Sequence, residues 1–485
     1  MTEPAPGVVP SMSARPVASV ALSLVGTALI VGGLGAGGAY VASERFLPPD
    51  GRVASGVVFD GTPVGDDATA AALVEQRAEA LSEQVVAVTH EGRVLVRAPL
   101  AALGLGVDTA SAIAGLDGVA RTGGWLRRLD EGRQAAAGHV AIVLPRSLDI
   151  KPLAEALAAF KDGLDRPPVA ARWDFVDGEV VPHEAGVVVD VHATADAILR
   201  ATERGADDDA ESGVLEVGLV VSRPLPAARS EIVASMDRST VVARYETIFA
   251  FVGGQTGRAQ NVARAAAGID GLVMMPGEEV SFNDLVGPRS IDNGFAHAGE
   301  IYKGEMRVGV GGGTCQVAST FHAAAYMGGL DVVERSPHSR PSGYIGIGLD
   351  ATVAYPHVDL VMSNPYSFPV AVWARIAEPG RLVVEVYGRE RPAKVDFAAS
   401  TVGVKKYKRK VRTAHWLTEG EFRRKQPGRR GVTVEKTRVI FYADGTRRSE
   451  TTRDEYPPTN EIYYVAPGTD ADEVLPPLPG DDANG

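Results

Sequence analysis

Residues 308–329, VGVGGGTCQVASTFHAAAYMGG, hold the only cysteine of the 485-residue chain, placed between three glycines and a helical pattern. The glycine run 311–313 permits positive φ and close backbone approach, so it predicts a tight turn. Apolar residues then recur at three- and four-residue spacing over 316–327, which predicts a helix that ends at the following Gly-Gly. Cys315 is therefore expected in the first helical turn, where the helix dipole and unpaired N–H groups lower the pKa of a thiol.

A nucleophilic thiol needs a base, and the chain has nine histidines. His338 lies in a loop that prolines flank, after a strand predicted over 330–333, and such a return loop can bring an imidazole back to the helix start. His357 and His297 are the other candidates. His322 is two helical turns from the thiol, so we interpret it as structural.

Two aspartates are candidates to orient the imidazole, Asp350 and Asp359, and the sequence does not choose between them. The alternative to a catalytic Cys315 is a small buried hydrophobic residue without chemistry.

Residues 17–42 carry no charged side chain and exceed the roughly 20 residues that cross a hydrocarbon core, which predicts a transmembrane helix. A cleaved signal peptide is the alternative, but it would have a shorter apolar core and a more basic start than the single Arg15. Because most of the chain follows this segment, we expect a single-pass membrane protein with its bulk outside the cytoplasm. Cysteines there usually form disulfides, and a lone Cys315 has no partner in its own chain, so it is either inert or used as a thiol.

Composition limits the remaining functions. A chain of this length should hold several domains, and its 45% hydrophobic and 23% charged residues are typical of a globular protein. The formal charge of -12 argues against nucleic acid as a partner. We expect no metal, because histidine pairs with ligand spacing are lacking, and no cofactor, because GVGGGTCQ lacks the lysine of a phosphate-binding loop.

Residues 240–385 resemble the VanW family in four stretches that follow in the family's order: TGRAQNVARAAAGIDGLVMMPGEEVSFNDLVGPRS, GGGTCQVASTFHAAA, GLDVVERSPHSRP and GLDATVAYPHVDLVMSNPYSFPV. The resemblance implies a cell-envelope protein. VanW domains have been linked to L,D-transpeptidases, which are cysteine enzymes that cross-link peptidoglycan stem peptides. By that analogy Cys315 attacks a diaminopimelate carbonyl of a donor tetrapeptide and releases D-Ala, and an acceptor amine resolves the thioester.

The same resemblance assigns roles to residues at matching positions. Cys315 and His338 become the catalytic pair, and Arg289 becomes the expected fork for a substrate carboxylate. The full set of expected supporting or substrate-binding residues is Gly311, Gly312, Gly313, Gln316, Arg289, Asn261, Arg335 and Asp350. The alternative function is a non-catalytic scaffold that binds peptidoglycan.

Two weak copies of one α+β unit precede this domain, each with a helix, a strand, a glycine turn, a strand and a helix opened by an aspartate, Asp108 or Asp190. They resemble the peptidoglycan-binding modules that precede VanW domains, which makes peptidoglycan the expected partner. The alternative is a stalk without a ligand. The sequence indicates no oligomeric state.

Alternating strands with a hairpin turn at Asp444-Gly445 follow the VanW-like stretch. This part resembles the G-five domain, a small extracellular β module associated with wall sugars, and its basic run over 405–412 is either a contact for anionic polymers or a solvated strand face. The sequence therefore predicts a multidomain α+β protein. Its expected parts are a cytoplasmic tail (1–16), an anchor (17–42), two peptidoglycan-binding repeats (46–140 and 141–230), a VanW domain (240–395), a small all-β module (396–470) and a disordered tail (471–485).

Overall fold

The computed structural model describes residues 40–477, except residues 66, 205–212, 250–255, 303–304 and 393. The predicted anchor over 17–42 falls almost entirely outside the described residues. Within the described ranges, every helix is too short or too polar to span a bilayer.

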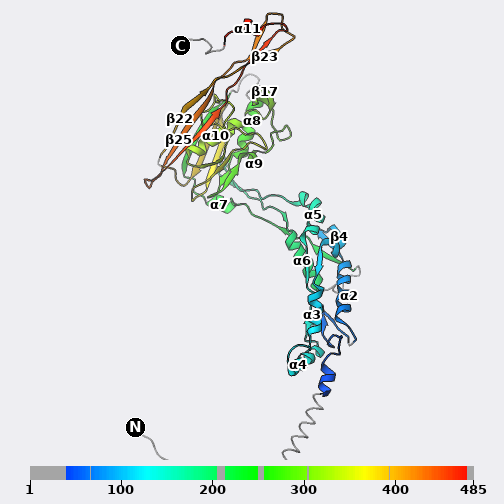
Figure 1. The fold of residues 1–485 in the computed structure, drawn as a ribbon. Coiled ribbons are helices and arrows are strands. Elements are labelled where there is room, and N and C mark those ends of the chain that lie inside the picture. The colour runs from blue at the N-terminus through cyan, green and yellow to red at the C-terminus, as the bar shows by residue number, and fades with distance from the viewer. Residues whose placement is uncertain are drawn as a thin grey trace, which may run out of the picture. The chain divides into compact units, whose positions relative to one another are not determined.

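The chain divides into two compact units that alternate along the sequence (Figure 1). The first contains the residues up to 166 together with 187–223, and the second contains 167–186 together with 224–485.

The first unit contains short strands and the helices α2 to α6, with a three-stranded sheet in the order β11-β3-β4. Buried apolar side chains of this sheet and of α5 and α6 form one cluster, so the sheet face and the two helices share a core. The elements are β1 (Val58–Phe59), β2 (Thr62–Pro63), α2 (Ala70–Glu83), β3 (Val85–His90), β4 (Arg93–Pro99), β5 (Leu105–Val107), α3 (Thr109–Gly118), α4 (Trp125–Ala136), β6 (Ala141–Ile142), β7 (Arg146–Leu148), α5 (Ile150–Leu164), β10 (Val188–Val189), α6 (Val191–Arg204), β11 (Val214–Gly218) and β12 (Val221–Ser222).

The two predicted aspartate caps are confirmed. The Asp108 carboxylate accepts the Ser111 N–H at 2.9 Å at the start of α3, and the Asp190 carboxylate accepts the Ala193 N–H at 2.8 Å at the start of α6.

The second copy of the repeat differs from the first in where its hairpin packs. Strands β8 (Arg172–Asp174) and β9 (Glu179–Val181) belong to the second unit, whereas β3 and β4 stay in the first. The Trp173 N–H donates to the Gly271 carbonyl at 2.9 Å, and the Phe175 ring stacks on Trp373 at 5.2 Å between centroids. These aromatic side chains therefore pack on an apolar surface of the second unit. The local sequence pattern does not predict this long-range packing.

The second unit has a core sheet in the order β13-β21-β20-β14, and α8 and α10 share one apolar cluster with it. Helix α10 begins at Thr314 and ends at Met327, which confirms the helix predicted after the glycine run. Nearly every one of its residues is buried, because α10 is apolar or small around its whole circumference and has neighbours on all sides. The other elements of this domain are α7 (Ser230–Ser235), β13 (Thr240–Ile248), α8 (Thr256–Ile269), β14 (Val273–Met274), β15 (Glu279–Ser281), α9 (Phe282–Val286), β16 (His297–Tyr302), β17 (Glu305–Val310), β18 (Asp331–Glu334), β19 (Val361–Ser363), β20 (Val370–Glu378) and β21 (Arg381–Gly388).

The C-terminal part of the second unit forms two three-stranded sheets, β22-β25-β26 and β23-β27-β24. The predicted hairpin turn is confirmed, because Asp444 and Gly445, at φ +85°, join β25 to β26. The predicted disordered tail begins instead with a short helix that packs Leu475 against this part of the unit. The elements are β22 (Lys394–Lys405), β23 (Arg409–Thr413), β24 (Phe422–Gln426), β25 (Gly431–Phe441), β26 (Arg447–Tyr456), β27 (Glu461–Val465) and α11 (Ala471–Val474).

Candidate functional site

The glycine turn fixes the position of Cys315. Gly311 and Gly313 have φ values of +90° and +115°, which disfavour other residues. A Cβ atom on Gly312 would lie 2.6 Å from the Gly299 carbonyl oxygen of β16. The turn therefore passes close to β16, and Cys315 becomes the second residue of α10, as the sequence predicts.

The thiol of Cys315 is half-buried and lies against Val353, whose N–H is 3.5 Å and whose carbonyl oxygen is 3.4 Å from Sγ. Burial raises the pKa of the Cys315 thiol, but the hydrogen bond and charge of His338 act in the opposite direction. The Val353 N–H and the Arg289 charge add to that effect, so the pKa of the thiol lies below its ordinary value. A larger share of the thiol is therefore ionised at neutral pH.

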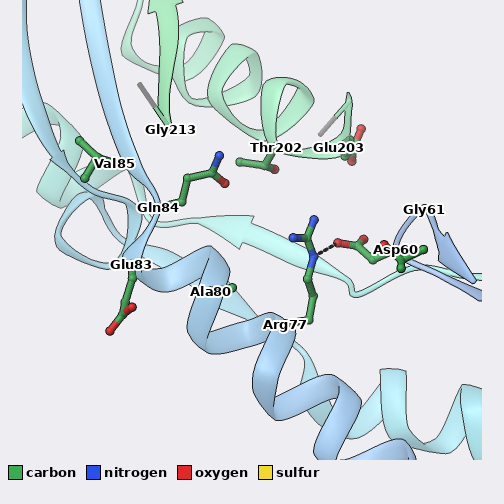
Figure 2. Close-up of a pocket in the computed structure, with 11 residues that line it drawn as sticks. Asp60, Gly61, Arg77, Ala80, Glu83, Gln84, Val85, Thr202, Glu203 and Gly213 are labelled. Atoms are coloured by element: carbon green, nitrogen blue, oxygen red, sulfur yellow. Dashed lines mark hydrogen bonds and ion pairs between the residues drawn. The ribbon is translucent and has the colours of Figure 1, made fainter. Parts of the chain in front are cut away.

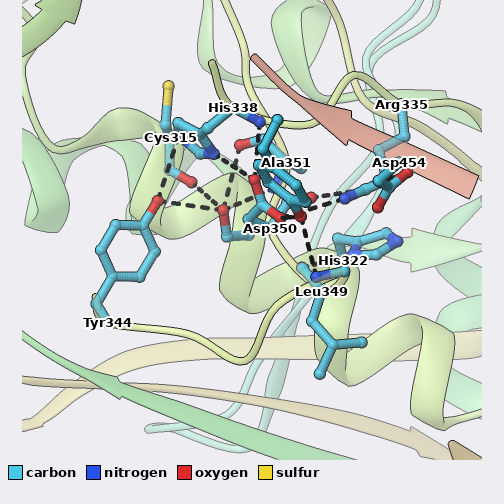
Figure 3. Close-up of polar contacts among 12 residues, drawn as sticks. Cys315, His322, Arg335, His338, Tyr344, Leu349, Asp350, Ala351 and Asp454 are labelled. Carbon is cyan, nitrogen blue, oxygen red and sulfur yellow. Dashed lines mark hydrogen bonds and ion pairs between the residues drawn. The ribbon is translucent and has the colours of Figure 1, made fainter. Parts of the chain in front are cut away.

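His338 connects this thiol to a carboxylate (Figure 3). Its side chain is buried, its Nδ1 lies 2.7 Å from an Asp350 carboxylate oxygen, and its backbone N–H donates to the same oxygen at 2.8 Å. Burial lowers the pKa of His338, but the hydrogen bonds to Asp350 and Cys315 outweigh burial and raise the pKa to about 9. Cys315, His338 and Asp350 thus lie in series, with the pKa of the thiol lowered and the pKa of the imidazole raised.

Asp350 is the aspartate that contacts the imidazole. Burial raises the pKa of Asp350, but hydrogen bonds from His338 and Tyr456 outweigh it and hold the pKa well below its usual range. Asp359 does not contact the imidazole: its carboxylate accepts the Asn283 N–H at 2.9 Å at the start of α9, and its charge acts to raise the pKa of Arg289 against the effect of burial.

Tyr344 is a further member of the site that the local sequence pattern does not indicate. Its hydroxyl lies 3.5 Å from His338 Nε2 and 3.3 Å from the Ser319 hydroxyl (Figure 3). Burial raises the pKa of Tyr344, so its hydroxyl keeps its proton. Its loop, SGYIGIG, has no periodicity that would mark the ring as inward-facing.

Arg289 presents an unsatisfied donor near the thiol. Its Nη1 donates to the Gly287 carbonyl at 2.6 Å, whereas its buried Nη2 finds no hydrogen-bond acceptor among the described residues. Burial lowers the pKa of Arg289, and the nearby charge of Cys315 opposes that shift. Since a buried guanidinium nitrogen without a partner is costly, Nη2 is available to an anionic ligand.

Asn261 and Gln316 are buried and direct their polar atoms into the protein. The Asn261 amide donates to the carbonyls of Ala296 and Gly312 at 2.9 and 3.0 Å, so it holds the glycine turn. The Gln316 amide donates to the Ile248 carbonyl at 3.0 Å, which joins α10 to the end of β13. Both residues position the site.

Arg335 also points inward. Its Nη1 contacts both carboxylate oxygens of Asp454 at 2.8 and 2.9 Å, and its Nε donates to the backbone oxygen of Asp350. The guanidinium fork of Arg335 is therefore occupied by the protein itself.

The other histidines lie apart from the thiol. His322 is fully buried, and its Nδ1 lies 2.8 Å from the Leu349 carbonyl oxygen, in agreement with a structural role. His297 pairs with Val310 in the β16-β17 ladder, and His357 is exposed in a turn.

A separate cavity of about 700 Å³ lies in the first unit (Figure 2). Polar side chains dominate its lining, including Arg77, Gln84 and Glu203, and Asp60 pairs with Arg77 at 2.5 Å. Over the described part of the chain, His, Cys, Asp and Glu side chains form no group of three that could hold a metal ion.

Two protein families match the chain. The family described as "VanW like protein" matches residues 257–387, and the family described as "Putative peptidoglycan binding domain" matches residues 96–211. The first range contains Cys315, His338 and Asp350.

Two curated proteins are similar to the chain. The uncharacterized protein YoaR of Bacillus subtilis is 34% identical over 165 residues, which are 34% of this chain and 53% of that protein. The vancomycin B-type resistance protein VanW of Enterococcus faecalis is 23% identical over 180 residues, which are 34% of this chain and 65% of that protein. The chain thus spans between half and two thirds of these relatives. The resemblance of this part of the chain to the VanW family is confirmed, because residues 257–387 match that family.

Two solved G5 domains were also found. The G5 domain of IgA1 protease has a TM-score of 0.11 and 19% identity, and covers 15% of this chain and 89% of its own. The G5 domain of HP0197 has a TM-score of 0.10 and 17% identity, and covers 15% of this chain and 99% of its own. TM-scores this low support no conclusion about the fold.

Proposed function

We propose that this protein is a cysteine-dependent acyltransferase of the cell envelope that acts on peptidoglycan stem peptides in the manner of an L,D-transpeptidase. The observation that carries the proposal is the contact series from Cys315 through His338 to Asp350 at the start of a buried helix. The match to a peptidoglycan-binding family over residues 96–211 supports the polymer as the substrate.

In the proposed reaction, the Cys315 thiolate attacks the carbonyl carbon of a stem-peptide amide and forms a C–S bond, and the carbonyl electron pair moves to oxygen. The N–H groups of Thr314 and Gln316 donate to the carbonyls of Gly311 and Gly313, so in the first turn of α10 we assign the Cys315 N–H to this oxyanion. The C–N bond then breaks, and Nε2 of His338 gives its proton to the leaving amine. An acceptor amine attacks the thioester, passes its proton to His338, and releases the thiolate.

Asp350 holds the imidazole in the orientation that this proton transfer requires, because its carboxylate contacts both Nδ1 and the backbone N–H of His338. Arg289 binds a carboxylate of the donor near the bond that breaks, and its unpaired Nη2 supports this role. The predicted anchor over 17–42 would place the domain outside the cytoplasm, next to its polymer.

The test uses the full-length protein, a tetrapeptide muropeptide as donor and a free amine as acceptor. We expect intact mass spectrometry to detect an acyl adduct on the wild type that the amine resolves, and no adduct on Cys315→Ser. Asp359→Asn is the matched control, because it changes the carboxylate that does not touch the imidazole. A thiol that reacts with iodoacetamide, yet forms no adduct and releases no amine from the donor, would contradict acyl transfer and leave the scaffold function.

A further inference from the structure

The hairpin of β25 and β26 lies beyond residue 387, where the match to the VanW family ends, yet it reaches the carboxylate of the candidate site. The Tyr456 hydroxyl on β26 donates to Asp350 Oδ1 at 2.5 Å and accepts the Gly348 N–H at 3.0 Å. Tyr456 is only 1% exposed, so water does not compete for these contacts. One hydroxyl thus binds two points of the loop that carries Asp350.

Two charged residues of the same hairpin hold this loop from another side. Lys436 on β25 donates to the Gly348 carbonyl at 3.1 Å and pairs with Asp454 at 3.1 Å. The Asp454 carboxylate on β26 accepts from Nη1 of Arg335, and Nη2 of Arg335 lies 3.3 Å from Asp350. The charged groups around the Asp350 carboxylate are therefore His338 on one oxygen and Arg335, which pairs with Asp454 of the hairpin, near the other.

The hairpin also fixes the helix that carries Cys315. Arg438 on β25 is 1% exposed and donates to the carbonyls of Tyr326 and Leu330 at 2.7 and 2.8 Å, at the end of α10. The same two strands therefore hold the thiol-bearing helix at one end and the Asp350 loop at another point.

We infer that the β25-β26 hairpin completes the candidate active site, with Tyr456 as a positioning residue that holds the Asp350 carboxylate against His338. The inference deepens the proposed function, since it assigns to the C-terminal module a part in activating Cys315. A VanW-like domain without this hairpin would keep its cysteine and histidine but lose the contacts that fix their aspartate.

The test compares Tyr456→Phe with wild type in the full chain. Cys315 is the only thiol, so iodoacetamide consumption reports on this site without background. We expect the alkylation rate at neutral pH to fall about tenfold and its pH midpoint to rise by about one unit, because a less ordered Asp350 supports the imidazolium less well. Tyr387→Phe is the matched control: it removes another hydroxyl that contacts a carboxylate, Glu385 at 3.2 Å, which is not among the contacts of the site.

A double-mutant comparison separates positioning from general stability. If Tyr456 acts through Asp350, adding Tyr456→Phe to Asp350→Asn changes alkylation no further. If Tyr456→Phe does not fold by circular dichroism, Lys436→Met tests the same hairpin. The inference is overturned if the folded variant keeps the wild-type rate and midpoint while losing only thermal stability, or if it lowers the rate equally in both backgrounds. A shifted midpoint in a protein that transfers no acyl group would uphold the positioning role and refute only the proposed function.

Discussion

Replacing Asp350 by asparagine tests whether the charge of this carboxylate lowers the pKa of the Cys315 thiol through His338. Asn has nearly the same shape and still offers an oxygen to the backbone N–H of His338, so the change removes mainly the negative charge. The lost interaction is that between Asp350 Oδ2 and His338 Nδ1 at 2.7 Å, in a pair whose side chains are 2% and 8% exposed.

The magnitude follows from the pKa of His338, which is about 9 in the folded protein. An ordinary imidazole has a pKa of about 6.5, and each unit corresponds to about 1.4 kcal/mol, so the partners of His338 outweigh burial and favour the imidazolium by about 3 kcal/mol net. Asp350 is the first of these partners, so its removal leaves burial opposed only by Cys315 and lowers the pKa of His338. A smaller share of the imidazole is then protonated at neutral pH, and it stabilises the Cys315 thiolate less.

The assay measures iodoacetamide alkylation of Cys315 from about pH 5 to pH 10, with intact mass as the readout. We expect Asp350→Asn to lower the rate at pH 7 at least tenfold and to move the midpoint up by about one unit or more. Asp359→Asn should follow the wild-type profile, and circular dichroism verifies that each variant is folded. If folded Asp350→Asn keeps the wild-type midpoint, the Asp350 carboxylate does not raise the pKa of His338, and it does not lower the pKa of the Cys315 thiol through His338.

Three further changes have defined outcomes. Arg289→Gln should lower the rate ratio of iodoacetate to iodoacetamide about tenfold, since a hydrogen bond to a charged group contributes about 1.5–3 kcal/mol; an unchanged ratio would argue against a carboxylate site. Gly312→Ala should destabilise the protein by about 1–3 kcal/mol in urea unfolding, because its Cβ would meet the Gly299 oxygen at 2.6 Å, whereas Gly343→Ala, with open space around it, should change stability by less than about 0.5 kcal/mol. Because the folded pKa of Asp350 is depressed, its contribution to stability is present above the unfolded pKa of about 3.9 and is lost as the pH falls below it. Urea midpoints measured down through that range should therefore fall more steeply for wild type than for Asp350→Asn, and parallel curves would contradict this.

Local sequence signals predicted the thiol end of the site. The glycine run, the helix that follows it and the place of Cys315 in its first turn all depend on neighbouring residues, and the structure confirms them. The same holds for the turn at Asp444-Gly445 and for the caps formed by Asp108 and Asp190. The roles of Cys315 and His338 in catalysis remain predictions.

The contacts that complete the site lie far apart in the chain. Tyr456 meets Asp350 across 106 positions, and neither residue lies in a pattern that indicates the other. From the sequence, Asp350 and Asp359 are both candidate partners of the imidazole. The path of the loop after Gly348 brings Asp350, and not Asp359, to His338. The sequence pattern predicts the hairpin of β8 and β9 as part of a repeat. Its aromatic rings instead pack in the second unit, so tertiary packing determines where this hairpin lies.

The β8-β9 hairpin belongs to the second unit, although the segments on either side of it belong to the first. This placement determines how the protein can be divided into fragments. The chain passes from one compact unit to the other at three places, after residues 166, 186 and 223. A protease must therefore cut all three connections before the halves are covalently free, and a single nick leaves them joined. A recombinant fragment that starts at residue 224 would lack Phe175 and leave the faces of Trp373 and Tyr387 bare to solvent, so poor solubility of such a fragment would say nothing about the cysteine it contains.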